Sequence, residues 1–120
     1  MFRTFVLMRL LVGGASYVAP GLSARLSGFD PDGNPQAAYW ARLFGVRDVV
    51  LGLGALQAEG VARRRIVHLT AACDAADLVS ALAGRRAGYL SPGAAALAGG
   101  VAIAAGAVAA AAATEVARSS

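Results

Sequence analysis

The sequence predicts an all-α fold, a four-helix transmembrane bundle, and three observations support this prediction. First, 58% of the residues are hydrophobic, 15% are charged and the mean hydropathy is +0.60, which is too apolar for an ordinary soluble domain. Second, the apolar residues gather in four stretches, each near the length that a helix needs to cross a bilayer. Third, the connectors are short, so the 120 residues form a single domain.

The four predicted spans alternate with polar connectors. They cover residues 4–22, 38–58, 66–83 and 89–113. The first span starts like a secretory signal, with a basic residue ahead of an apolar run. However, Arg9 interrupts that run, and the nearest small-residue cleavage site ends at Ala19 and is followed by Pro20. We therefore expect this segment to be retained as a membrane span.

Glycines predict where the helices pack closely. Small residues spaced four apart let two helix backbones approach each other, so Gly99 and Gly106 are predicted packing positions in the uncharged last span. The alternative is low-complexity alanine enrichment without a packing role. In the second span, Gly45, Asp48 and Gly52 share one helix face. Another backbone is therefore expected to pack beside this aspartate.

The connectors predict the orientation of the bundle. With four spans, both termini lie on one side, and that side carries Arg3, Arg63, Arg64, Arg65 and Arg118. The opposite side carries Arg25, Arg85 and Arg86. Because arginines are enriched in cytoplasmic connectors, this count of five against three predicts a multi-pass protein of the cell membrane with both termini in the cytoplasm.

Six charged residues fall within the predicted spans. They are Arg9, Arg42, Arg47, Asp48, Asp74 and Asp77, three of each sign. An unpaired charge at bilayer depth is costly, so such residues normally face the bundle interior and pair. We therefore expect these residues to form a buried ionic network or a binding site. Arg42 lies nearest the outer interface, where its side chain can extend to the headgroups.

Depth along the helices predicts the partners. Counted from the cytoplasmic ends of their spans, Arg47 and Asp77 both lie eleven residues in, or about 16 Å. Arg9 and Asp74 differ in depth by about 5 Å, which an arginine side chain can bridge. The predicted pairs are therefore Arg47 with Asp77 and Arg9 with Asp74, and Asp48 can share either arginine.

The sequence predicts no metal site, no cofactor and no contact with nucleic acid. Asp74 and Asp77 match part of a motif by which membrane phosphotransferases hold two metal ions, but Leu78 and Leu82 replace its glycine and arginine, and no further aspartate follows. Cys73 is the only cysteine, and we expect it to be a small packing residue. The chain has a net charge of +4, which suits contact with anionic lipid headgroups. It lacks the basic stripe with interleaved aromatic residues that is typical of nucleic-acid binding.

These features resemble the small bacterial four-helix membrane proteins grouped near the DoxX family. One branch carries an R-[DE]-x-x-L-G signature in its second helix, and Arg47, Asp48, Leu51 and Gly52 match it. Asp77 resembles the acidic residue of the third helix in that branch. The resemblance implies a compact four-helix bundle in the cytoplasmic membrane. It implies little about activity, because a shared fold does not transfer function.

The expected function is that of a small, non-enzymatic membrane protein, either an accessory subunit or a binder of a lipid or a small apolar ligand. Its expected partners are the lipid bilayer and a membrane protein or a second copy of the chain. Two alternatives are proton-coupled transport of a small solute and a membrane enzyme that acts on a lipid-soluble substrate. Transporters are usually built from internal repeats or broken helices, so such features would support the transport alternative. An enzyme would need an acid or base outside the ion pairs.

Overall fold

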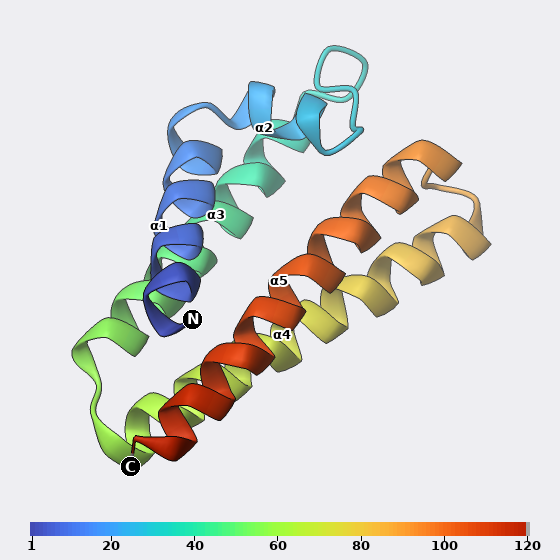
Figure 1. Ribbon diagram of the computed structural model, residues 1–120. Helices are drawn as coiled ribbons and strands as arrows, with labels where there is room; N and C mark the ends of the chain where they lie inside the picture. The colour runs from blue at the N-terminus through green and yellow to red at the C-terminus, as the bar shows by residue number, and fades with distance from the viewer. Residues whose placement is uncertain (120) are drawn as a thin grey trace.

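The computed structural model describes residues 1–119, and this part of the chain folds into helices joined by turns and short connectors, with no strand (Figure 1). The helices are α1 (Phe2–Val18), α2 (Pro20–Leu26), α3 (Gln36–Gln57), α4 (Gly60–Ala87) and α5 (Pro92–Arg118). α1 packs mainly on α3, and α4 packs mainly on α5. The start of α1 and the end of α5 lie at the same end as the connection between α3 and α4 (Figure 1).

The first predicted span differs from the structure. α1 ends at Val18, and the chain then bends by 115° into the short helix α2. Pro20 explains the break, because proline has no backbone N–H for a continuing helix and favours the first position of a new one. α2 exposes Leu22 and Leu26 and buries Ala24. Residues 20–22 therefore belong to a helix that runs across the end of the bundle.

A short turn joins α4 to α5, and its residues carry signals that end one helix and start the next. Gly88 has a φ of +84°, the left-handed conformation that commonly ends a helix. Ser91 then caps α5, since its side chain accepts a hydrogen bond from the backbone N–H of Ala94 at 3.1 Å. Pro92 occupies the first turn of α5. These signals place residues 89–91, which the sequence assigns to the last span, in the turn.

Glycines bring α1 and α3 into close contact. A Cβ atom added at Gly45 would lie 2.5 Å from the carbonyl oxygen of Gly13, and one added at Gly13 would lie 2.6 Å from that of Gly45. At Gly52, an added Cβ would lie 3.1 Å from the Cβ of Arg9. The backbone that the sequence predicts beside Gly45 and Gly52 is therefore that of α1.

α5 contacts α4 through a face of small residues. A Cβ added at Gly99 would lie 3.3 Å from Leu78, and one added at Gly106 would lie 3.6 Å from the Cβ of Asp74. The buried residues of this face are spaced three and four apart, as in coiled coils. They include Ala102, Ala105, Ala109, Ala112 and Val116. Ala110, four residues after Gly106, is exposed, because that step turns it about 40° further from the buried face.

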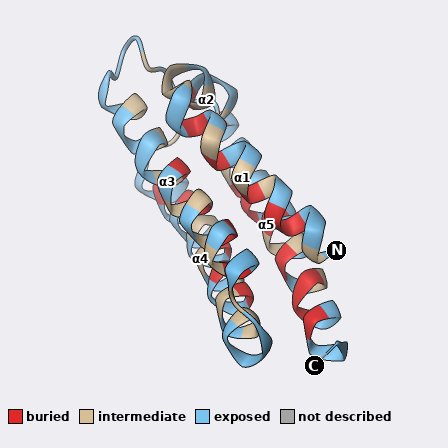
Figure 2. Cartoon of the chain, turned by 90° about the vertical axis from the view of Figure 1, so that its left-hand side faces the viewer, coloured by how far each residue is buried: buried red, intermediate tan, exposed pale blue. Residues whose placement is uncertain are grey.

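The apolar core is small and lies toward the end with the termini. It is formed by Phe5 and Val6 of α1, Ala55 of α3, Val67 of α4 and three alanines of α5. Figure 2 shows the buried residues as narrow stripes on the inner faces, while most of the remaining surface is exposed or intermediate. All four long helices meet in this core, which fixes the end of the bundle.

Within residues 1–119, two helices, α4 and α5, are long and apolar enough to cross a membrane, and the bent pair of α1 and α2 raises the number to three if it is one span. α3 has 22 residues, which is also sufficient length. It differs from α4 and α5 in that three charged residues, Arg42, Arg47 and Asp48, lie within its apolar part. Whether α3 can cross a membrane depends on how these three charges are paired.

Candidate functional site

The most buried charged group within residues 1–119 is the guanidinium of Arg9, whose side chain is 1% exposed. It lies between two carboxylates that are also buried. Arg9 Nη1 donates to Asp48 Oδ1 at 3.0 Å, and Arg9 Nη2 donates to Asp74 Oδ2. One arginine of α1 therefore links α3 and α4. We call Arg9, Asp48 and Asp74 the inner cluster.

A second ion pair joins α3 to α4 beside the inner cluster. Arg47 Nη1 and Nη2 donate to Asp77 Oδ1 and Oδ2 at 3.0 and 2.7 Å, which is the bidentate geometry that favours arginine over lysine. The side chains of Arg47 and Asp77 are 32% and 34% exposed. The ring of Phe44 lies under the guanidinium of Arg47 at 4.9 Å. We call Arg47 and Asp77 the outer pair.

The two groups are in contact. Arg47 Nη2 lies 3.7 Å from Asp48 Oδ1, so Asp48 is close to both arginines. The structure therefore forms the two pairs that the depth argument predicts, Arg9 with Asp74 and Arg47 with Asp77, and it places Asp48 between the two arginines. The Nε atoms of Arg9 and Arg47 are buried and have no hydrogen-bond partner within residues 1–119.

Each residue of the inner cluster faces a glycine on a neighbouring helix. Gly52 of α3 lies opposite Arg9, and Gly106 of α5 lies opposite Asp74. A Cβ added at Gly13 of α1 would lie 2.9 Å from the Cβ of Asp48. The glycines make room for charged side chains inside a narrow bundle. The glycine and charge patterns of the sequence therefore describe one feature.

Arg42 lies outside this network. Its Nε donates to the backbone carbonyl of Tyr17 at 3.2 Å, and its guanidinium lies 5.7 Å from the Tyr17 ring. This contact lies at the end of α1, away from the inner cluster. It also changes the charge balance. Without Arg42, the network has two arginines and three aspartates, so the equal numbers expected from the sequence are not found inside it.

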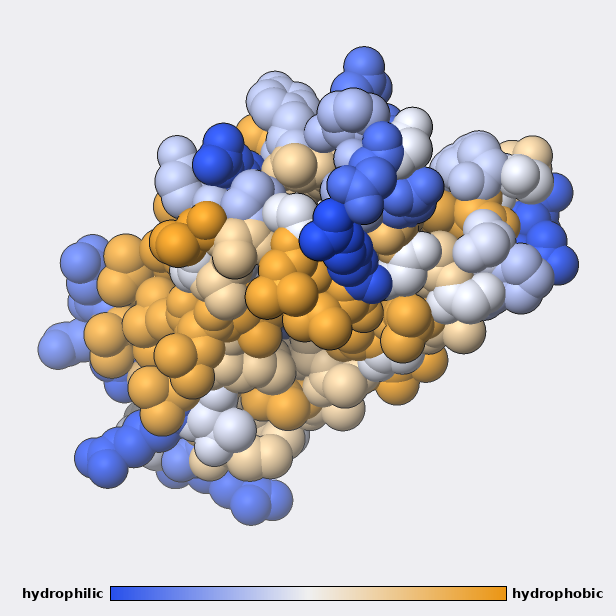
Figure 3. Space-filling view, turned by 90° about the horizontal axis from the view of Figure 1, so that it is seen from above, coloured by the Kyte–Doolittle hydropathy of each residue, from blue (hydrophilic) through white to orange (hydrophobic). Residues whose placement is uncertain are grey.

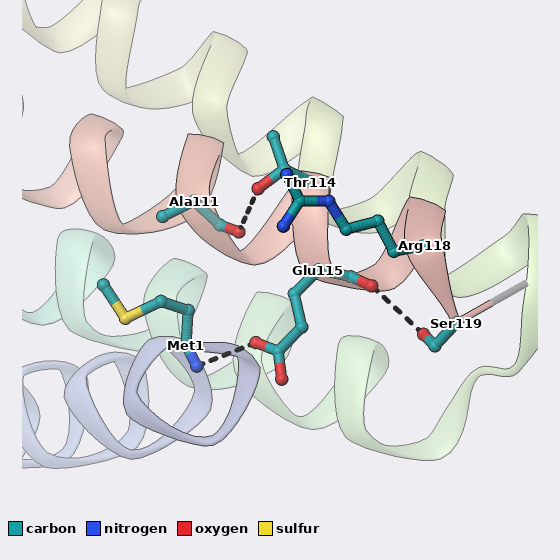
Figure 4. Close-up of a pocket in the computed structure, with 6 residues that line it drawn as sticks. All are labelled: Met1, Ala111, Thr114, Glu115, Arg118 and Ser119. Carbon is teal, nitrogen blue, oxygen red and sulfur yellow. Dashed lines mark hydrogen bonds and ion pairs between the residues drawn. The ribbon is translucent and has the colours of Figure 1, made fainter.

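A contact that the sequence analysis did not predict lies at the termini (Figure 4). The N-terminal ammonium of Met1 lies 2.7 Å from Glu115 Oε2, and the same oxygen accepts the backbone N–H of Phe2. Both charged groups border an open hollow of about 510 Å³ on α5. This exposed pair joins the start of α1 to the end of α5. Only the position of Glu115 beyond an apolar run could have suggested it.

The described residues offer no group of three or more His, Cys, Asp or Glu side chains that could hold a metal ion. Asp48, Asp74 and Asp77 are all engaged by arginines instead. The arginines bind at least one oxygen of each carboxylate and offset two of the three negative charges. In chemical terms the site is an ionic cross-link between helices.

Comparison with known proteins finds no family model, no curated protein and no solved structure that matches this chain. Its function therefore has to be inferred from its own residues.

Proposed function

We propose that this chain is a four-span integral membrane protein in which α1, α3, α4 and α5 cross the bilayer. The distribution of side chains carries the proposal. Among the described residues, 24 large hydrophobic side chains are exposed, whereas Arg9, Asp48 and Asp74 are buried. Figure 3 shows a broad apolar surface with hydrophilic residues mainly at its margins. A soluble protein has the reverse arrangement, while a bilayer favours this one.

The ion pairs support the placement of α3 as a span. All three of its charged residues have partners, since Arg47 binds Asp77, Asp48 binds Arg9 and Arg42 binds the carbonyl of Tyr17. Charged groups inside membranes are tolerated where they face the bundle and pair. α1, with 17 residues, is about 25 Å long, close to the thickness of the hydrocarbon core.

Aromatic residues support the position of the outer interface. Tyr17, Tyr39, Trp40 and Tyr89 are exposed and lie at or near the helix ends away from the termini. Tyrosine and tryptophan are enriched where a membrane meets water. The other end carries the arginine cluster that begins at Arg63. We therefore propose that the protein lies in the cell membrane with this cluster and both termini on the cytoplasmic side.

The proposed role is that of a non-enzymatic accessory subunit or a binder of a lipid or a small apolar ligand. The carboxylates at bilayer depth are bound to arginines, so they hold helices together and are poorly suited to acid or base chemistry. The likeness of Arg47, Asp48, Leu51 and Gly52 to a DoxX-like signature supports the same class of protein. The wide exposed apolar surface supports lipid or another membrane protein as the partner.

Proton-coupled transport is a second candidate, and the charge balance favours it. Three carboxylates against two guanidinium groups leave one negative charge in excess when all are ionised. A proton held by one carboxyl group would neutralise the network. Infrared spectroscopy should then show a carboxylic acid band that disappears in Asp48→Asn or Asp74→Asn. Absence of such a band across the working pH range would remove this candidate.

Topology mapping tests the four-span proposal. Reporters are inserted into the connectors after Gly28, Ala58 and Gly88 and fused to the C-terminus of the full chain. We expect periplasmic activity after Gly28 and Gly88 and cytoplasmic activity at the other two positions. The protein should also stay in the membrane fraction after alkaline washing. A periplasmic C-terminus, or release by alkali, would contradict the proposal.

A further inference from the structure

We propose that the outer pair marks the contact between two copies of this chain in the membrane. The surface consists of Arg47 and Asp77 with the neighbours one helical turn away on the same sides of α3 and α4. These neighbours are Leu43, Val50, Cys73 and Ser80. We call this surface the α3/α4 seam. The proposal rests on the four-span placement. It adds the partner of the outer pair, which the four-span placement does not specify.

The exposure of the outer pair indicates that the seam is covered. Arg47 lies in the middle of α3, and the side chains of the pair are about one third exposed. In a four-span protein this position is near the centre of the bilayer, where lipid tails offer no hydrogen bonds or counter-charges. By contrast, the inner cluster of the same network is almost fully enclosed. The outer pair lacks such enclosure within one chain.

The geometry of the pair fits a second copy. Arg47 and Asp77 hydrogen-bond to each other, so they lie at the same depth on adjacent helices. A two-fold axis along the membrane normal exchanges α3 and α4 across the contact. Arg47 of each copy then faces Asp77 of the other. The seam is therefore complementary to itself in charge, and two pairs form a closed group of four alternating charges.

The flanking side chains fit the same contact. Leu43 and Val50 are exposed apolar residues on α3, and Ser80 on α4 is small. Apolar and small residues beside the charges can pack tightly and exclude lipid. A lipid headgroup matches the seam less well, because it would have to leave the interface to reach the middle of the bilayer. Another protein would need its own charge pair at this depth.

Cross-linking tests the contact directly. Because α3 and α4 are antiparallel, Leu43 and Ser80 lie on the same side of the pair, about 6 and 4.5 Å away along their helices. Two tagged full-length chains, both with Cys73→Ala, are co-expressed, one with Leu43→Cys and the other with Ser80→Cys. We expect a disulfide-linked dimer in native membranes. The matched control uses Leu11→Cys with Ile103→Cys, which are exposed on α1 and α5, and should give at least about tenfold less dimer.

A charge exchange tests whether the ion pairs determine recognition. Arg47→Asp combined with Asp77→Arg keeps opposite charges within one chain, and two copies of the exchanged chain remain complementary. Mixed with the original chain, it places like charges opposite each other. We expect each version to cross-link with itself and mixed dimers to fall by more than about tenfold, since like charges at a contact are strongly unfavourable. Equal formation of all dimers would overturn the role of the charges.

The number of copies per particle separates this proposal from the four-span one. Single-molecule photobleaching of the labelled chain in phospholipid vesicles should show two steps. A single step with four-span topology would overturn the dimer and leave the four-span placement standing. A different protein or a phospholipid bound to a single copy would also overturn it. Loss of the four-span topology would overturn both.

Discussion

The inner cluster and the outer pair use the same chemistry in different surroundings. The side chains of Arg9, Asp48 and Asp74 are at most 4% exposed. Helices α3 and α4 each supply one carboxylate to the arginine of α1. Arg47 and Asp77 form a complete bidentate pair, but one third of each side chain is open. The difference lies in burial. The inner cluster is buried completely by its own chain, whereas the exposed part of the outer pair is available for contact with another chain.

Removal of Arg9 should give the largest effect. Arg9→Leu leaves Asp48 and Asp74 buried without their main partner, and breaking a buried ion pair costs about 3–5 kcal/mol. That is a large part of the stability of a small protein. We expect the yield of monodisperse protein, followed by fluorescence-detected size-exclusion chromatography of a tagged chain, to fall sharply.

The control for this prediction is Arg42→Leu, because Arg42 lies outside the network and contacts Tyr17. It should keep most of the yield. If Arg9→Leu were as well folded as Arg42→Leu, the inner cluster would not hold the bundle together.

The close crossing of α1 and α3 should give the next largest effect. Gly13→Ala places a Cβ against the backbone of α3 and should destabilise the protein by about 1–3 kcal/mol, as in other overpacked sites. Gly14→Ala is the matched control, because an added Cβ there meets nothing within 4 Å. It should be neutral or stabilise the helix by up to about 1 kcal/mol. Thermal unfolding in detergent measures both, and equal shifts would contradict the crossing.

The terminal pair should give the smallest effect. Glu115 and the N-terminal ammonium are both more than half exposed, and exposed ion pairs contribute little to stability. Glu115→Gln should therefore leave the melting temperature unchanged within error. A marked loss would show that the contact between the start of α1 and the end of α5 is as important as the inner cluster.

The sequence predicts the helices and the charge partners well, and for a physical reason. Charged residues within apolar helices have to pair, so Arg9, Arg47, Asp74 and Asp77 restrict the arrangement strongly. Depth alone could not reveal that Arg42 turns toward Tyr17 or that Asp48 lies between two arginines, because those contacts depend on helix rotation. The bend before α2 was signalled by Pro20, but the apolar character of Leu22 suggested a continuous span. The role of Gly13 also depends on how the two helices cross, which its own span does not show.

The central claim is that paired charges on neighbouring helices fix the helices against one another. The double-mutant cycle of Arg47→Leu and Asp77→Leu tests it most directly, since within residues 1–119 the Asp77 side chain hydrogen-bonds only to Arg47. Each single variant should lose stability, and the double variant should recover much of the loss, because neither charge is left unpaired. We predict a coupling energy well above the roughly 0.6 kcal/mol typical of hydrogen bonds within membranes. Losses that simply add, with no coupling energy, would contradict the account.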